Sequence, residues 1–324
     1  MSTPFTETAG LPVNAAQPVV TFSPVTFSVP GRPAPLEIKV SAPVSGENLP
    51  VMLFSHGHGG SNFLASLNGY GPLANFWAAH GVIVLQPTHL DFPGLGLRDD
   101  VSAGAPLFWR SRVEDMHFIL DHLEDIESIV PGLRGRVDRT KTAAVGHSLG
   151  GHTVGMLSGM TVTNPHDGTV LDLRDERITA SVIMAGPGAG EGLAAQAAER
   201  FPDLAGTTFS QMTTQSLVVV GENDHNPMFT EEKTWRADAY WRSPGQNKTL
   251  LTLFEAEHML GGVSGYDAAE TTDENPERVA ALRALIWAYL RSALDPSDPA
   301  WTDACAALAA QPTPWGRIDV RQPR

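Results

Sequence analysis

Ser148 stands in the sequence GHSLG, with Gly146 and Gly150 on either side of it. The preceding residues TAAVGH are typical of a buried strand, and the following residues LGGHTVGML are typical of a helix. Because a serine at such a strand-to-helix turn adopts a strained backbone conformation, glycines are needed where strand and helix approach each other. The helix N-terminus would also place backbone N–H groups near the serine oxygen. This arrangement predicts a nucleophilic serine that forms a covalent intermediate.

A nucleophilic serine needs a base to take its proton, and the base needs an acid to fix its tautomer. Two later apolar runs end on such residues: SLVVVGEND ends at Asp224, and TLLTLFEAEH ends at His258. Folds built around a G-x-S-x-G turn carry the nucleophile, the acid and the base in this chain order. The sequence therefore predicts Ser148 as nucleophile, Asp224 as acid and His258 as base. This chemistry needs no metal and no cofactor.

The tetrahedral intermediate of such a reaction carries an oxyanion that needs hydrogen-bond donors. The strand-like run PVMLFS leads into HGHGG, and the residue that follows the nucleophile is the usual second donor. We assign the two donors to the backbone N–H groups of His58 and Leu149. Further residues adjoin these motifs or the first irregular loop and are candidates for the pocket: Gly57, Gly59, His89, Phe108, Trp109 and His147.

Other residues could carry this chemistry, but the sequence makes each of them a weaker candidate. Glu222 is an alternative acid, whereas His225 adjoins Asp224 and is poorly placed to act as its base. Three histidines could in principle gather a metal ion: His56, His58 and His89. No H-E-x-x-H pattern and no carboxylate-flanked pattern supports such a site.

Four stretches, FSHGHGG, GHSLGG, VVVGENDHNP and EAEHML, resemble the serine esterases of the α/β-hydrolase superfamily. They are similar to the group around platelet-activating-factor acetylhydrolase, chlorophyllase, dienelactone hydrolase and the polyester-cleaving cutinases. The segment RSRVEDMHFILDHL also resembles the helix that precedes the nucleophile strand in that group. The resemblance covers residues 36–293 and implies ester hydrolysis on the triad named above. One departure is His58, because an apolar or aromatic residue is expected at its position.

Strand-like and helix-like segments alternate along the chain. Alternating, β-branched runs at 19–29 and 36–43 predict an antiparallel pair. Buried strands are expected at 50–57, 82–89, 142–148, 178–186, 216–224 and 249–258. Helices are expected at 73–81, 107–130, 149–159, 232–241 and 276–294. The pattern predicts an α/β-hydrolase fold, with a mostly parallel central sheet, an antiparallel N-terminal edge and helices on both faces.

The chain is expected to divide into a flexible N-terminal extension (1–18), a catalytic domain (19–295) and a C-terminal tail that packs on this domain (296–324). Two irregular segments, 89–106 and 187–215, interrupt the alternation of strands and helices. Both follow the carboxyl ends of strands, which is the side where open α/β sheets bind ligands. We therefore expect them to form pocket walls or a small cap.

Composition excludes several classes of protein. The net charge is −14, with 22 basic and 36 acidic residues, and the sequence contains no run of basic residues. Both features argue against binding to nucleic acid or to anionic membranes. No run reaches the roughly 18 apolar residues of a membrane span, and the N-terminus lacks the pattern of a secretory signal. A cytoplasmic location is therefore expected, while the oligomeric state stays open. The single cysteine, Cys305, excludes an internal disulfide and is expected to be a structural thiol.

Together these observations predict a cofactor-free serine hydrolase that cleaves carboxylic esters. Short to medium acyl or polyester-like substrates are expected, because the 187–215 segment has no long apolar helix and the negative charge repels anionic substrates. A thioesterase, a lactonase or a perhydrolase on the same triad stays open. The alternative from another class is a non-catalytic binding module, although such modules normally lack a triad residue.

Overall fold

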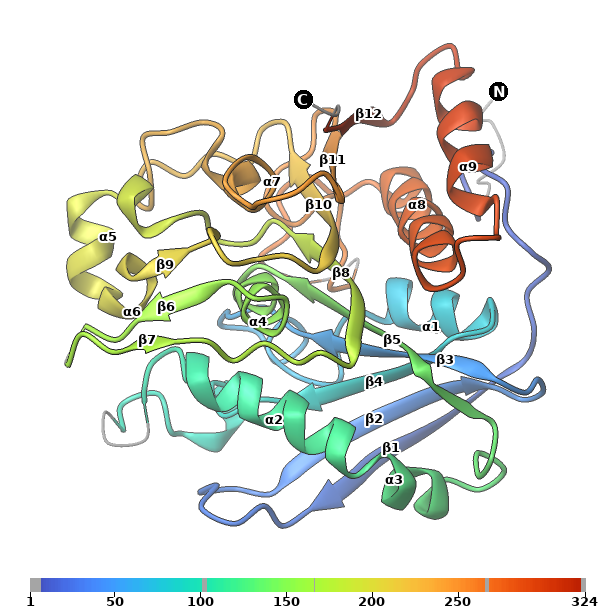
Figure 1. Cartoon of the computed structure of the whole chain (residues 1–324), viewed down its shortest axis with the longest axis horizontal. Coiled ribbons are helices and arrows are strands. Elements are labelled where there is room, and N and C mark those ends of the chain that lie inside the picture. Colours follow the sequence, from blue (N-terminus) through green and yellow to red (C-terminus); the bar gives the residue numbers. More distant parts are fainter. Residues whose placement is uncertain (1–6, 101–103, 166, 266–267, 322–324) are drawn as a thin grey trace.

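The computed structural model describes residues 7–100, 104–165, 167–265 and 268–321 (Figure 1). The main sheet of this part of the chain has the strand order β1-β2-β4-β3-β5-β8-β10-β11-β12. Its strands are β1 (Val19–Phe27), β2 (Leu36–Pro43), β3 (Leu49–Ser55), β4 (Ile83–Thr88), β5 (Val137–His147), β8 (Ile178–Met184), β10 (Gln215–Gly221), β11 (Lys248–Leu253) and β12 (Gly316–Val320). The strands from β4 to β11 are parallel, whereas β1, β2 and β12 pair antiparallel at the two edges. This confirms the mostly parallel sheet with an antiparallel N-terminal edge.

Helices cover both faces of the main sheet, as the sequence predicts (Figure 1). The longer helices are α1 (Gly71–Ala79), α2 (Trp109–Asp121), α3 (Leu123–Ile129), α4 (Leu149–Leu157), α8 (Pro276–Leu294) and α9 (Ala300–Ala309). Successive residues of a strand point to opposite faces. Leu53 of β3 accordingly packs in the core beneath α2 and α4, while its neighbours Met52 and Phe54 pack beneath α1 and α8. Burial on both faces explains why these strands are continuous apolar runs.

Several elements differ from the sequence expectations. The helix expected over 107–130 is two helices, α2 and α3, which meet at His122. The segment 232–241 is helical only from Trp235, as a 3-10 turn followed by α7 (Asp238–Trp241). The strand expected to reach residue 258 ends at Leu253, because Glu255 has a positive φ of 56° that breaks the extended conformation.

The segment 187–215 contains short elements that the sequence does not indicate. Two helical turns follow one another there, α5 (Ala195–Arg200) and α6 (Pro202–Ala205). The strand β9 (Thr207–Thr208) of this segment joins two strands from earlier in the chain, β6 (Thr161–Thr163) and β7 (Val170–Leu171), in a small antiparallel sheet of order β7-β6-β9. These elements stand beyond the main sheet at the left of Figure 1.

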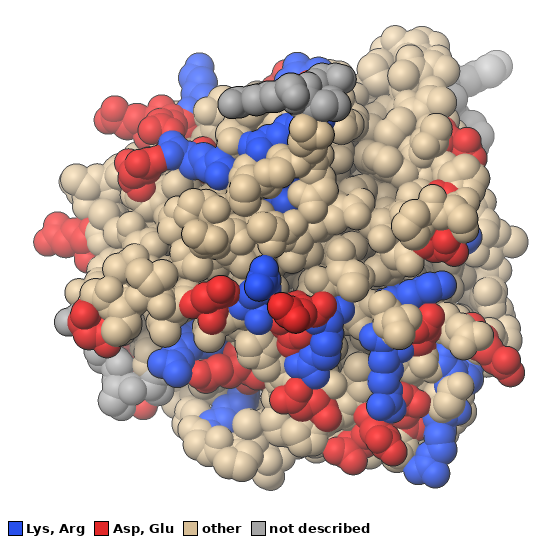
Figure 2. All heavy atoms as spheres, in the orientation of Figure 1, with Lys and Arg blue, Asp and Glu red and all other residues tan. Residues whose placement is uncertain are grey.

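Both ends of the described chain lie against the main body. Leu11 is 3% exposed and belongs to the core cluster that includes residues of α1, α8 and α9, and the Gln17 N–H donates to the Ala79 carbonyl at 2.8 Å. In the tail, α9 packs against α8, and β12 extends the sheet by pairing with β11. On the face shown in Figure 2, basic and acidic side chains are interspersed around α2 and α3, without a basic patch.

Candidate active site

Ser148 occupies the turn between β5 and α4. Its backbone has φ 55° and ψ −121°, far from the conformations that non-glycine residues normally adopt. A Cβ atom on Gly146 would lie 2.1 Å from the Gly150 carbonyl oxygen, and one on Gly150 would lie 2.0 Å from the Ser55 carbonyl oxygen. Only glycine allows α4 to approach β3 and β5 this closely. The two glycines thus allow the sharp turn that carries the Ser148 side chain.

Three side chains from separate segments meet beyond the carboxyl ends of the parallel strands. Ser148 Oγ lies 3.0 Å from His258 Nε2, and His258 Nδ1 lies 2.9 Å from Asp224 Oδ2. Asp224 follows β10 and His258 follows β11, so both lie in loops at the edge of the sheet where Ser148 stands. Because a carboxylate only accepts hydrogen bonds, Nδ1 of His258 carries the proton and Nε2 accepts from the Ser148 hydroxyl. The structure therefore brings together the three residues that the sequence predicts as a triad.

The acid of this group has a second partner, which the sequence did not indicate. Arg236 Nε lies 3.3 Å from Asp224 Oδ2, and another nitrogen of Arg236 donates to the Ala185 carbonyl at 3.1 Å. Burial raises the pKa of the Asp224 carboxyl, but the hydrogen bond from His258 and the charges of His258 and Arg236 outweigh this effect. The pKa of Asp224 therefore lies below its ordinary value, and the carboxylate stays ionised.

A buried pair, Tyr70 and His147, links the loop before the site to the backbone of His258. His147 Nε2 lies 2.9 Å from the His258 carbonyl oxygen, which can only accept, so Nε2 carries the proton. His147 Nδ1 then accepts from the Tyr70 hydroxyl at 3.1 Å, and the Tyr70 oxygen accepts from the Gly57 N–H at 2.9 Å. Burial and the charge of His258 lower the pKa of His147 to about 3, so its ring is neutral.

Hydrogen bonds hold the backbone of the loop 56–61 on both sides. Three of its carbonyl groups accept hydrogen bonds from side chains. The His56 carbonyl accepts from Arg112, the Gly57 carbonyl from the His56 ring, and the Gly59 carbonyl from Arg98. Two of its N–H groups donate to side chains: Gly57 to Tyr70 and Ser61 to Glu270. The N–H of His58 has no partner among the residues that the structure describes. Leu149 is the first residue of α4, so its N–H has no acceptor within the helix.

A cavity of about 260 Å³ lies over Ser148 and His258. Its apolar lining consists of Leu107, Leu149, Pro187, Phe201, Leu204, Phe229 and Trp235. Besides the triad, its polar lining consists of His58, Asn226 and Arg236. Segment 187–215, expected to form a pocket wall, supplies three of these residues. The segment that supplies Asn226, Phe229, Trp235 and Arg236 had no signal in the sequence beyond its closeness to Asp224.

The other pocket candidates are not among the residues that line this cavity. Those residues are Gly57, Gly59, His89, Phe108, Trp109 and His147. His89 is fully buried and bonds Ser55 and Asp115, while Trp109 packs in the core at 8% exposure. The alternative acid, Glu222, accepts a hydrogen bond from the Glu255 N–H, whereas His258 bonds Asp224.

A family model described as the alpha/beta hydrolase family matches residues 52–321. That range includes the sheet from β3 onward, the Ser148 turn and the loops that carry Asp224 and His258. The chain belongs to the α/β-hydrolase family. Membership supports hydrolase activity and agrees with the sheet order and the strained serine. A comparison with curated proteins finds no match.

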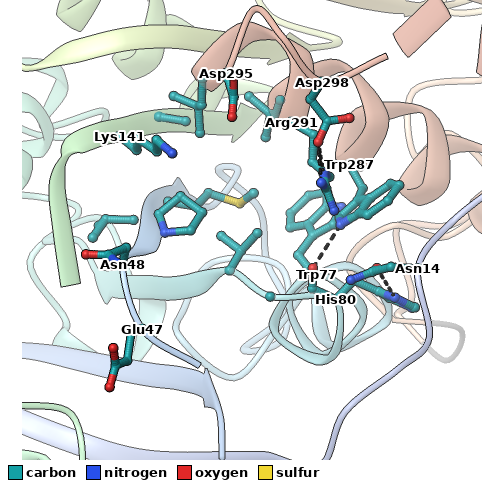
Figure 3. Close-up of a pocket in the computed structure, with 18 residues that line it drawn as sticks. Asn14, Glu47, Asn48, Trp77, His80, Lys141, Trp287, Arg291, Asp295 and Asp298 are labelled. Carbon is teal, nitrogen blue, oxygen red and sulfur yellow. Dashed lines mark hydrogen bonds and ion pairs between the residues drawn. The ribbon is translucent and has the colours of Figure 1, made fainter. Parts of the chain in front are cut away.

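This hydrolase has a second cavity, of about 330 Å³, at the amino ends of the parallel strands (Figure 3). Several of its polar groups are paired with one another. The Trp287 indole donates to the His80 carbonyl, the His80 ring bonds Asn14, and Arg291 pairs with Asp298. Because it holds no residue of the triad, it is separate from the candidate active site.

Two further features of the hydrolase concern metals and membranes. Within the described ranges, no group of three or more His, Cys, Asp or Glu side chains is arranged to hold a metal ion. Those ranges also contain no helix that is long and apolar enough to cross a membrane.

Proposed function

We propose that this α/β hydrolase cleaves carboxylic esters through an acyl-enzyme on Ser148. The Ser148 oxygen attacks the ester carbonyl carbon while its proton passes to Nε2 of His258. The tetrahedral intermediate then breaks its bond to the alcohol oxygen, which leaves with the proton from His258. Water attacks the acyl-enzyme by the same route and releases the acid. Asp224 keeps His258 in the required tautomer and stabilises the imidazolium.

The observation that carries the proposal is the continuous hydrogen-bonded chain from Ser148 through His258 to Asp224, with both contacts near 3 Å. The N–H groups of His58 and Leu149 are the proposed oxyanion donors. Tetrahedral oxyanions need such donors with no competing partner. The bonds that occupy the carbonyl groups beside His58 hold this loop in one conformation.

The cavity supports esters with short to medium acyl chains. Its volume of about 260 Å³ is below the roughly 300–1,000 Å³ that drug-sized ligands occupy. Its walls are mostly apolar, and the rings of Phe201 and Phe229 stack at 5.9 Å. This agrees with the sequence resemblance to the esterase group that contains acetylhydrolases and cutinases. A thioester and a lactone belong in the substrate panel, because the same triad could open either.

The test combines active-site labelling with one matched pair of variants. A fluorophosphonate probe should label the wild-type protein at Ser148, and Ser148→Ala should lose labelling and on the order of 10⁴-fold or more in turnover of p-nitrophenyl butyrate. The control is Ser158→Ala, which removes a buried hydroxyl at the other end of α4. It should keep both labelling and turnover. An unlabelled wild-type protein, or a Ser148→Ala variant with more than a few per cent of the activity, would exclude the proposed mechanism.

A further inference from the structure

The cavity over Ser148 contains a second imidazole, which the proposed reaction does not use. His58 lines this cavity, and its Nδ1 lies 2.8 Å from Asp91 Oδ2. Asp91 is fully buried, and its other oxygen accepts from Arg112 at 2.5 Å. Arg112 is also fully buried and fixed by a bond to Thr153 at 3.1 Å. The ring of His58 is therefore anchored from behind by a buried carboxylate and a buried guanidinium.

The proposed catalytic base is held by the same kinds of group, a carboxylate followed by a guanidinium. His258 is bound to Asp224, and Asp224 is bound to Arg236, with contacts of 2.9 Å and 3.3 Å. The two imidazoles differ in what their Nε2 atoms meet. Nε2 of His258 lies 3.0 Å from Ser148 Oγ, whereas Nε2 of His58 has no hydrogen-bond partner among the residues that the structure describes. The His58 side chain is 26% exposed, so a ligand in the cavity can reach it.

The donor and acceptor roles of this second ring follow from its partner. Burial raises the pKa of the Asp91 carboxyl, but the charge of Arg112 outweighs it and holds this pKa well below its usual range. Asp91 is therefore a carboxylate and can only accept, so Nδ1 of His58 carries the proton. In the neutral ring, Nε2 then carries a lone pair. In this form the His58 ring presents an oriented acceptor to the cavity.

The position of this acceptor relative to the substrate follows from the chain itself. The backbone N–H of His58 is a proposed oxyanion donor. The ester carbonyl oxygen would therefore bind to the backbone of the same residue whose side chain offers Nε2. A group that donates to Nε2 must then be attached close to the ester carbonyl. A remote hydroxyl on a long acyl chain would be separated from the ester carbonyl, and so from His58, by the length of that chain.

We propose that His58 selects esters that carry a hydroxyl group beside the ester linkage, such as 2- or 3-hydroxyacyl esters or 2-hydroxyethyl esters. This inference rests on the proposed ester hydrolysis. The substrate hydroxyl donates to Nε2 of His58 while the carbonyl oxygen accepts from the His58 N–H. A substrate without the hydroxyl leaves Nε2 desolvated and unpaired, which costs roughly tenfold in kcat/KM.

The test compares matched esters that differ only by the hydroxyl. To test a hydroxyl on the acyl side, the rate of hydrolysis of methyl 3-hydroxybutyrate is compared with that of methyl butyrate. To test a hydroxyl on the alcohol side, 2-hydroxyethyl butyrate is compared with ethyl butyrate. Release of acid is followed by titration at constant pH, and each rate is divided by the rate of alkaline hydrolysis of the same ester. This removes the inductive effect of the hydroxyl. For the wild-type protein we expect at least one pair to favour the hydroxylated member by about tenfold.

Variants of His58 assign this preference to its ring. His58→Leu removes the acceptor, and the preference should fall to about one. His58→Gln keeps a donor for Asp91 and an acceptor for the cavity, so part of the preference should remain. Asn226→Ala changes another polar residue of the cavity wall and should leave the preference unchanged. Because each preference is a ratio within one protein, a general loss of activity in a variant does not affect it.

The outcomes separate this inference from the proposed function. If the wild-type protein hydrolyses all four esters through Ser148 with no preference, selection by His58 is wrong and ester hydrolysis stands. A preference that persists in His58→Leu likewise overturns the role of His58. If none of the esters is hydrolysed and Ser148 is not labelled, the proposed function fails and this inference fails with it.

Discussion

At the scale of single residues, the charge balance around Asp224 decides how the proposed base works. One oxygen of Asp224 accepts a hydrogen bond from His258 at 2.9 Å and forms an ion pair with Arg236 at 3.3 Å. The charge of Arg236 helps to hold the pKa of the Asp224 carboxyl below its ordinary value, so the carboxylate stays ionised. Arg236 should therefore keep the Asp224 carboxylate ionised, and the enzyme active, at lower pH than the contact with His258 alone would allow.

We predict that Arg236→Gln moves the acid limb of the kcat/KM profile to higher pH, because removal of this positive charge raises the pKa of the Asp224 carboxyl. Arg236→Lys keeps the charge and should leave the limb close to its wild-type position. The measurement is kcat/KM for p-nitrophenyl butyrate from pH 4 to 9. A limb that does not move in Arg236→Gln would show that Arg236 has only a structural role.

The sequence predicted some of these residues and not others, for a physical reason. Ser148, Asp224 and His258 each directly follow or end an apolar run, so local periodicity indicates their positions. Arg236 lies in a segment expected to be a helix, and its contact with Asp224 depends on how that segment packs against β10. Such a contact has no local pattern. The cavity wall formed by Phe201 and Leu204 was indicated only as an irregular segment.

At the scale of elements, the Tyr70–His147 pair connects parts of the chain that are distant in sequence. Tyr70 precedes α1, His147 ends β5, and the two reach the Gly57 N–H at one end and the His258 carbonyl at the other. Each hydrogen bond between the Gly57 N–H and the His258 carbonyl has one possible direction, because the carbonyl can only accept and the N–H can only donate. The pair therefore fixes the loop before His58 and the loop that carries His258 relative to each other.

We predict that Tyr70→Phe lowers kcat by roughly tenfold with little change in KM, because it leaves His147 Nδ1 and the Gly57 N–H without their shared partner. The ring contact with Phe54, at 4.7 Å between centroids, is kept. Tyr289→Phe is the matched control, since it removes a buried tyrosine hydroxyl from α8, away from the site. Equal losses of activity and melting temperature in both variants would contradict a positioning role. Steady-state kinetics and thermal unfolding are the measurements.

At the scale of the whole molecule, the sheet was predictable in its centre and not in its periphery. The central strands are apolar runs separated by helices, and the alternation alone predicts a parallel sheet. β12 has the sequence GRIDV, and its Ile318 pairs with Leu251, a partner that is distant in the chain. The edge of the sheet with which such a short polar strand pairs is determined only by the tertiary structure of the rest of the sheet. The same holds for the two- and three-residue strands β6, β7 and β9.

The fold also buries a lysine far from the candidate active site, which affects its stability. Lys248 begins β11 and is fully buried, with Nζ donating to the Thr214 carbonyl and to Asn247 Oδ1, both at 2.8 Å. Burial lowers the pKa of Lys248 to about 8. In the unfolded chain the pKa of a lysine is about 10.4. Between these two values the unfolded chain binds more protons than the folded one, so stability must rise with pH there.

We predict that Lys248→Met changes this pH dependence by a measurable amount. The buried ammonium costs the wild-type protein about 3 kcal/mol below pH 8, and this cost disappears by about pH 10.5. The free energy of unfolding of the variant, relative to the wild type, should therefore fall by about 3 kcal/mol between pH 7 and pH 10.5. Lys233→Met is the control, because that exposed side chain is in water in both states. Urea unfolding at several pH values measures the difference, and a constant difference for Lys248→Met would show that burial of its charge costs nothing.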